Sequence, residues 1–322
     1  MKKNDDDYHA KHGHYNPVKA KENGWPIRLS KSSFMNYLSC PRKFWWTYVE
    51  MEGIRLPATS FMIHGTAVHK SLENLYGNLM DDKKLLKGDL RPLFDNDPDD
   101  KEHVPYEHEA VDILADLEAM RLESWGEEHY VPIEFEVKHE VLDPDLGVIL
   151  VGMIDGLLRH PVTGDLVIVE LKTGKLGKIK QTKTRKELAY YAHLLELIGY
   201  GKTSHFMYFY PECTNEEILL DLLEREAKSN AKEAGSNPVV PNYEVWVGDS
   251  QGVAYIEPFM KRTATAFTKS LYTVVDNLKL LEWPMKWNEY FCTQWCDYAM
   301  SCETELMDAG WKQDEYGGYN DE

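Results

Sequence analysis

Three residues able to do metal chemistry lie on two adjoining apolar segments of the chain. Asp155 lies within one strand-like run at 147–159, and Glu170 and Lys172 end the next run at 165–172. Residues i and i+2 of a strand point to the same face, so Glu170 and Lys172 share a side, which Asp155 can reach across a hairpin. Two carboxylates and an ammonium at a sheet edge can hold a divalent metal and activate a water beside a phosphate.

Three further motifs accompany this D…E-x-K pattern. They are the Ser- and aromatic-rich segment 29–44, the G-x-x-x-H sequence at 65–69, and the segment 185–191 that follows the E-x-K strand. In this order the four motifs resemble those of PD-(D/E)XK nucleases of the RecB family. The resemblance covers about residues 29–302 and is strongest to the stand-alone RecB-like exonucleases, which include the CRISPR-associated ones.

The resemblance implies a metal site and assigns roles within it. His69, Asp155, Glu170 and the backbone carbonyl of Leu171 would be the ligands of Mn²⁺ or Mg²⁺, and the imidazole favours Mn²⁺. Lys172 would position the attacking water or stabilise charge that develops on the phosphate. The chemistry implied is metal-assisted hydrolysis of a phosphodiester.

The helix after the E-x-K strand adds a further candidate, Tyr191. It lies four residues after Glu187, a spacing that places both on one helical face. Glu187 departs from the glutamine of the family and adds negative charge. Tyr191 either contacts a phosphate, orients Lys172 or packs in the core. Glu134 and Glu136 are weaker candidates, because they alternate with apolar residues as on any half-exposed strand.

The cysteines form a second pattern. Cys40 is remote, whereas Cys292, Cys296 and Cys302 are close together near the end of the chain. This division resembles the iron–sulfur RecB-like nucleases, in which a [4Fe–4S] cluster joins the two ends of the domain and four thiolates are the usual ligands. The three residues between Cys292 and Cys296 depart from the usual two. A structural Zn²⁺ site and a set of buried free thiols remain alternatives, and Cys213 has no partner in the pattern.

Composition sets bounds on the class of protein. The chain has 322 residues, 43% of them apolar, which is enough for a sizeable core. No run of about 18 apolar residues occurs and the N-terminus is charged, so we expect no membrane span, no secretory signal and a cytoplasmic location. The net charge of −18 opposes nucleic-acid binding, although the basic clusters at 31–43 and 172–186 are separate from the acidic ones.

Periodicity predicts an α/β fold with a mixed central sheet flanked by helices, as in restriction endonucleases. We expect a flexible arm at 1–28, then a nuclease domain at 29–302 and an acidic tail at 303–322. Within the domain, 29–130 is predicted as mainly helical, 131–282 as the nuclease core and 283–302 as the cysteine segment. Helices are expected at 65–80, 108–126, 184–199 and 251–281, strands at 133–138, 147–159, 165–172, 203–210 and 242–248, and irregular connections at 81–104 and 225–240.

These patterns together predict a metal-dependent DNA exonuclease that acts on single strands or DNA ends in recombination, repair, phage replication or CRISPR adaptation. A helicase, recombinase or CRISPR integrase would be its partner, because the chain has no nucleotide-binding motor motif. The alternative is a non-catalytic DNA-binding or scaffold subunit with the same fold. Nucleic acid would contact two sets of residues. The first set is Arg42, Lys43, Trp45 and Trp46, and core packing is the alternative role of the two tryptophans. The second set is in the loop after the site and comprises Lys175, Lys178, Lys180 and Lys183.

Overall fold

The chain is divided into two compact units. The computed structural model describes residues 2–54, 57, 59–95, 109–212, 216–233, 243–248 and 252–309. Unit 1 comprises residues 1–55, 142–149 and 270–322, and unit 2 comprises 56–141 and 150–269. The proposed metal-site motifs therefore lie in unit 2, and the cysteines of the second pattern, Cys40 and the C-terminal three, lie in unit 1.

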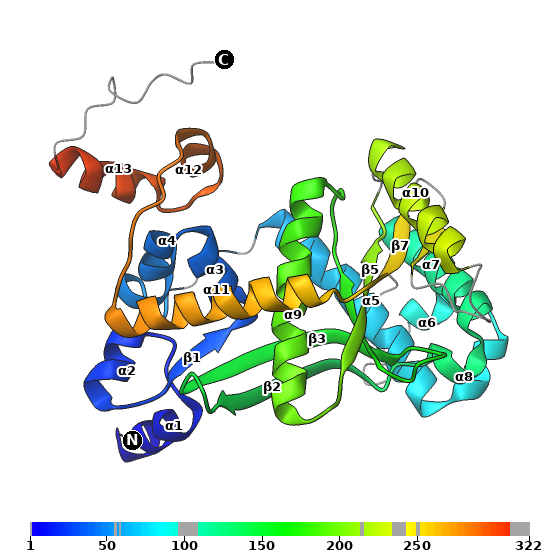
Figure 1. Ribbon diagram of the computed structural model, residues 1–322, viewed down its shortest axis with the longest axis horizontal. Helices are drawn as coiled ribbons and strands as arrows, with labels where there is room; N and C mark the ends of the chain where they lie inside the picture. Colours follow the sequence, from blue (N-terminus) through cyan, green and yellow to red (C-terminus); the bar gives the residue numbers. More distant parts are fainter. Residues whose placement is uncertain are drawn as a thin grey trace. The chain divides into compact units, whose positions relative to one another are not determined.

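A mixed sheet is the centre of unit 2 (Figure 1). Its strands follow the order β3-β4-β5-β7-β6, with β2 beside β3. β3 and β4 form an antiparallel hairpin, β4 and β5 are parallel, and β7 is antiparallel to both β5 and β6. The strands are β2 (Glu134–Asp143), β3 (Val148–Arg159), β4 (Leu166–Leu171), β5 (Thr203–Tyr210), β6 (Glu244–Val247) and β7 (Val253–Pro258). The predicted α/β class with a mixed sheet is thus confirmed.

Helices cover both faces of this sheet. The odd-numbered side chains of β4 and β5, such as Val169 and Met207, pack with α5 and α7 in one apolar core. The opposite face is covered by α9, whose buried side includes Leu188 and Leu195. β4 is buried along its whole length because it is enclosed between these layers. The helices of unit 2 are α5 (Ser60–Asp81), η2 (Lys83–Lys87), α6 (Arg91–Asp95), α7 (Glu109–Trp125), α8 (Glu127–Tyr130), α9 (Lys178–Ile198) and α10 (Glu216–Glu233).

Unit 1 differs from the expected flexible arm at its N-terminus. Residues 2–12 and 17–23 are helical. Asn16 caps the second of these helices, and its Ala20 packs in the interior with no exposed surface. Ser30 caps the next helix through a capping box with Ser33. The elements of unit 1 are α1 (Lys2–His12), α2 (Pro17–Asn23), β1 (Ile27–Ser30), α3 (Lys31–Ser39), α4 (Pro41–Trp45), η1 (Trp46–Glu50), α12 (Glu289–Trp295) and α13 (Ala299–Asp308).

Several expected boundaries were wrong. Residues 253–258, expected to begin a long helix, form β7 in the interior of the sheet, and the helix is α11 (Lys261–Leu280). The predicted loop that would carry Lys178, Lys180 and Lys183 is instead the first part of α9. Residues 83–87 and 91–95 are short helices, and α10 continues to Glu233. None of the helices in the described part of the chain combines the length and hydropathy needed to cross a membrane.

Candidate active site

The hairpin of β3 and β4 brings the predicted acidic residues together. Gly156 pairs with Val169 in the antiparallel register, so the next pair towards the open end is Asp155 and Glu170. A carboxylate oxygen of Asp155 accepts a hydrogen bond of 2.8 Å from the backbone N–H of Leu171. Asp155 is therefore held against the E-x-K segment, as the sequence predicted, and the backbone of Leu171 lies beside it.

Helix α5 brings His69 to the same place. Its Nδ1 lies 3.5 Å from a carboxylate oxygen of Glu136 and 3.7 Å from one of Asp155. The helix can approach the end of β4 closely because residue 65 is glycine, since a Cβ there would lie 3.2 Å from the hydroxyl of Thr173. This contact gives the glycine of the G-x-x-x-H motif a physical role, which is to let the helix that carries His69 pack against the site.

Glu136, a weaker candidate in the sequence analysis, lies at the site. The ligand atoms of His69, Glu136 and Asp155 all lie within 4.8 Å of one another, so Glu136 belongs with the metal-site candidates. Its φ of 48° is in the left-handed region, which is rare for a residue with a side chain. This local departure from the strand was not visible in the alternating pattern. Glu134 behaves differently, since it bonds His139 and Tyr200 instead.

Lys172 lies between two carboxylates. Its ammonium bonds Glu170 and lies 2.9 Å from a carboxylate oxygen of Glu187 on α9. Glu170 is 1% exposed and Glu187 is 6% exposed, so both charges are removed from water and need a nearby cation. The glutamate that departs from the family pattern is therefore a partner of Lys172.

Tyr191 packs beside these charges. A Cβ at Gly152 would lie 2.8 Å from its ring, so the ring and β3 meet in a contact that only glycine permits. Burial raises the pKa of Tyr191, and the negative charges of Glu170 and Asp155 raise it further. The hydroxyl therefore stays protonated at neutral pH. Close packing is shown, and a contact with phosphate or an orienting role towards Lys172 stays a prediction.

The electrostatics of the site fit a divalent cation. Burial alone lowers the pKa of His69, but its hydrogen bond with Glu136 and the charges of Asp155, Glu136 and Glu170 outweigh burial and raise the pKa. Negative charge thus exceeds positive charge around the imidazole. Hard carboxylate oxygens with one imidazole are a donor set suited to Mn²⁺ or Mg²⁺, and the residues present match it.

A second group of polar contacts supports the loop after β4. The ammonium of Lys180 donates to the backbone carbonyls of Thr173 and Gly174, at 2.8 Å each. Burial lowers the pKa of Lys180 to about 8, with repulsion from Lys172 as a further cause. His64 Nε2 lies 2.7 Å from a carboxylate oxygen of Glu212. Lys180, expected in a loop, lies in α9 and holds the backbone of the site. Its contact with nucleic acid stays a prediction.

Removing the imidazole of His69 should weaken metal binding. His69→Ala should lower the affinity for Mn²⁺ roughly tenfold or more, because one of the converging donors is lost. Calorimetry on the full chain measures this. His64→Ala is the matched control, since His64 is on the same helix but pairs with Glu212, and its Mn²⁺ affinity should equal that of the wild type. Equal affinities for the wild type and His69→Ala would leave His69 with a packing role only.

The predicted cysteine set meets in unit 1. Cys40, Cys292, Cys296 and Cys302 line one cavity, together with parts of the segment before α12. Burial raises the pKa of Cys292, and it raises the pKa of Cys302 to about 11. Electrostatic interaction with Cys40 and Cys296 further raises the pKa of both thiols, so the four sulfur atoms lie near one another. Cys213 lies outside the described residues.

The aromatic residues expected to bind nucleic acid are packed within unit 1. Trp46 stacks on Tyr298 at a centroid distance of 6.1 Å, in line with the core-packing alternative. The guanidinium of Arg42 lies over Trp45 at 4.2 Å and bonds the carboxylate of Glu305. These contacts join the first helices of unit 1 to α13. Contacts of this segment with nucleic acid stay a prediction.

Comparison with known protein families agrees with this site. Residues 28–303 match the PD-(D/E)XK nuclease superfamily. The matched segment includes both the carboxylate site of unit 2 and the four gathered cysteines of unit 1. A search of curated proteins finds no match.

Proposed function

Because the chain belongs to the PD-(D/E)XK nuclease superfamily, we propose that it is a metal-dependent DNA exonuclease of the RecB-like, iron–sulfur type. The observation that carries the proposal is the convergence of His69, Glu136 and Asp155 within 4.8 Å of one another, beside Glu170 and Lys172 on the neighbouring strand. Superfamily membership supports a metal-dependent nuclease. Action on DNA ends, the RecB-like type and the cluster are the proposed refinements.

The chemistry is hydrolysis of a phosphodiester, in which water attacks phosphorus and the bond to one ester oxygen breaks. A divalent cation bound by His69, Glu136, Asp155 and Glu170, with the carbonyl of Leu171 as a further ligand, would supply Lewis acidity and lower the pKa of the attacking water. Lys172 adds a fixed positive charge near the phosphate, where negative charge develops.

The neighbours of Lys172 keep that charge in position. Glu170 and Glu187 hold its ammonium from two sides, so the side chain needs little reorganisation when substrate binds. Tyr191, protonated and packed against Gly152, can donate a hydrogen bond to a phosphate oxygen or to one of the carboxylates. Its proposed role is to position these groups.

The four cysteines are proposed as ligands of a [4Fe–4S] cluster. All four thiols line one cavity, and four thiolates are the usual ligands of such a cluster. A tetrahedral Zn²⁺ site held by the same four thiolates is the alternative.

The proposed substrate is DNA with a free end or a single-stranded segment, in recombination, repair, phage replication or CRISPR adaptation in the cytoplasm. A helicase, recombinase or integrase would supply such ends. The competing proposal, a non-catalytic DNA-binding scaffold, needs the fold but has no use for buried carboxylates around a lysine. The intact set of His69, Asp155, Glu170 and Lys172 therefore favours the enzyme.

A nuclease assay on linear and circular DNA tests the proposal. Labelled linear single strands should be shortened with Mn²⁺ or Mg²⁺ and left intact with EDTA, while circular single strands of the same sequence persist. Cleavage of the circles would make the protein an endonuclease. Intact linear and circular DNA in both metals, with single and double strands tested, would favour the scaffold.

A further inference from the structure

A cavity in unit 2 concentrates positive charge in an acidic protein. Its volume is about 650 Å³, within the usual range of small-ligand sites. Among the described residues, its charged lining consists of four cations and a single carboxylate, namely Arg185, Arg225, Lys228, Arg262 and Glu257. The whole chain has 36 basic and 54 acidic residues, so this local excess of cations opposes the overall composition.

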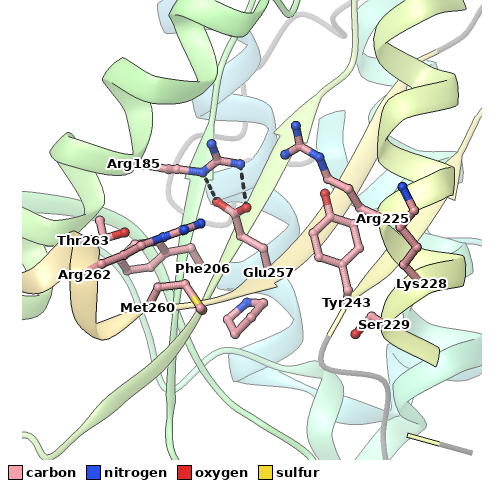
Figure 2. A pocket seen from close by; sticks show the side chains of 11 residues that line it. Arg185, Phe206, Arg225, Lys228, Ser229, Tyr243, Glu257, Met260, Arg262 and Thr263 are labelled. Atoms are coloured by element: carbon pink, nitrogen blue, oxygen red, sulfur yellow. Dashed lines mark hydrogen bonds and ion pairs between the residues drawn. The ribbon is translucent and has the colours of Figure 1, made fainter. Parts of the chain in front are cut away.

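The carboxylate in the cavity is already neutralised. Arg185 donates to both oxygens of Glu257, at 2.6 and 2.7 Å, and the hydroxyl of Tyr208 donates to one of them at 2.7 Å. Figure 2 shows this pair at the centre of the cavity, with Arg225 on one side and Arg262 on the other. The pair fixes Arg185 as part of the wall and leaves little net charge to repel an anion.

The other cations are held weakly or not at all. Arg225 and Lys228 pair with acidic residues one turn earlier on α10, namely Asp221 and Glu224, and both pairs are at least a third exposed. Exposed pairs of this kind contribute little and exchange partners readily. Within the part of the chain that the structure describes, Arg262 has no carboxylate within 4 Å.

Two further features, the hydroxyl of Tyr243 and the N-terminal turn of α11, border the same cavity. Tyr243 is 6% exposed, and its hydroxyl lies beside the guanidinium of Arg225 and donates no hydrogen bond within the described ranges. It points towards Arg225 (Figure 2), and burial raises the pKa of Tyr243, so the hydroxyl remains a donor. The first turn of α11 supplies Arg262 and Thr263 and has no acidic residue, and the N-terminus of a long helix favours negative charge.

An apolar wall completes the cavity. Phe206, Pro258 and Met260 line it, and Phe206 and Met260 lie on the side away from Arg225 and Lys228 of α10 (Figure 2). A bare phosphate would not use these surfaces, whereas a nucleotide would place its base against them and its phosphate among the guanidinium groups. The cavity is distinct from the metal site, because α9 presents Glu187 to Lys172 and Arg185 to the cavity.

We infer that this cavity binds a phosphorylated nucleotide, with the phosphate held by Arg225, Arg262 and Tyr243. Two sources share this chemistry, a free mononucleotide and the 5′-phosphorylated end of a DNA strand. The inference does not depend on the metal site or on nuclease activity.

Calorimetry on the full chain in EDTA tests the inference without any cleavage. The probes are 2′-deoxyadenosine 5′-monophosphate, deoxyadenosine, and an oligodeoxyadenylate with either a 5′-phosphate or a 5′-hydroxyl. A phosphorylated probe should bind at least about tenfold more tightly than its unphosphorylated counterpart, and Arg262→Gln should remove this preference, as expected for loss of a charge-assisted hydrogen bond. Binding of the monophosphate identifies a free nucleotide, and binding of the phosphorylated oligonucleotide alone identifies a strand end.

Lys261→Gln is the matched control, because it removes the same charge from the adjacent exposed position on α11 but lies outside the cavity. It should keep the affinity of the wild type to within about twofold. Equal losses in the two variants, or no phosphate-dependent binding of either probe pair, would overturn the inference. Because EDTA chelates the divalent metal that cleavage would require, these outcomes are independent of whether the protein proves to be a nuclease.

Discussion

Asp155→Asn is expected to lower metal-dependent DNA cleavage by about 10²–10³-fold or more while the chain stays folded. The substitution removes a negative charge from the group that includes His69 and Glu136, so the cation needed to polarise the phosphate would bind weakly. An asparagine oxygen can still accept the hydrogen bond from the Leu171 N–H, which preserves the local backbone. Rates of release from labelled linear DNA, with circular dichroism as the folding check, measure the effect.

Asp165→Asn is the control for this experiment. It removes the same charge from the turn of the same hairpin, at the end away from the carboxylate site, and it should cleave at the wild-type rate. Full activity in Asp155→Asn would refute the site.

Lys172→Ala should reduce cleavage to a similar degree, but it should also lower the thermal stability of the metal-free protein, because Glu170 and Glu187 would lose their shared cation. A divalent metal should then restore part of the lost stability. A variant with normal stability and normal cleavage would show that Lys172 has no part in the site.

Cys40→Ala is expected to bleach the protein and destabilise it. Anaerobically purified wild-type protein should be brown, with absorption near roughly 400 nm and about four irons per chain, as for a cluster held by four thiolates. Cys40 and Cys292 are about 250 residues apart, and a cross-link over such a loop contributes on the order of 5 kcal/mol in the chain-entropy relation. The melting temperature should fall by on the order of 10 °C.

Changes at Cys292, Cys296 or Cys302 should have the same effect, because all four thiols line one cavity. Cys213→Ala should leave both colour and stability unchanged. Iron and zinc analysis separates the remaining cases. One zinc in a colourless protein would replace the cluster with a structural zinc site, and a metal-free protein of unchanged stability would leave only buried thiols.

Much of the metal site could be predicted from local patterns. The hairpin of β3 and β4 follows from two apolar runs joined by a turn, and its register brings Asp155 beside Glu170. The periodicity of α5 places His69 on a helix, and motif order identified the superfamily. These inferences succeed because strand alternation and helical spacing are properties of short segments.

The sequence analysis missed the helix α2 and the strand β7 for a common reason. The helix α2 depends on a cap at Asn16 and on burial of Ala20. β7 is a strand because it pairs with both β5 and β6. Long-range packing overrides local propensity in such segments, and a pattern search over a short window does not detect it.

The sequence by itself therefore determined the fold class, the superfamily, and the type of chemistry. Tertiary structure decided which further charges join those of the predicted site. Glu136, at a left-handed position within β2, lies beside His69 of α5, and Glu187 meets Lys172 because α9 packs over the sheet. The basic cavity likewise takes Arg185, Arg225 and Arg262 from three helices that are distant in sequence. Electrostatic interaction depends on separation in space, and separation along the chain does not reveal it.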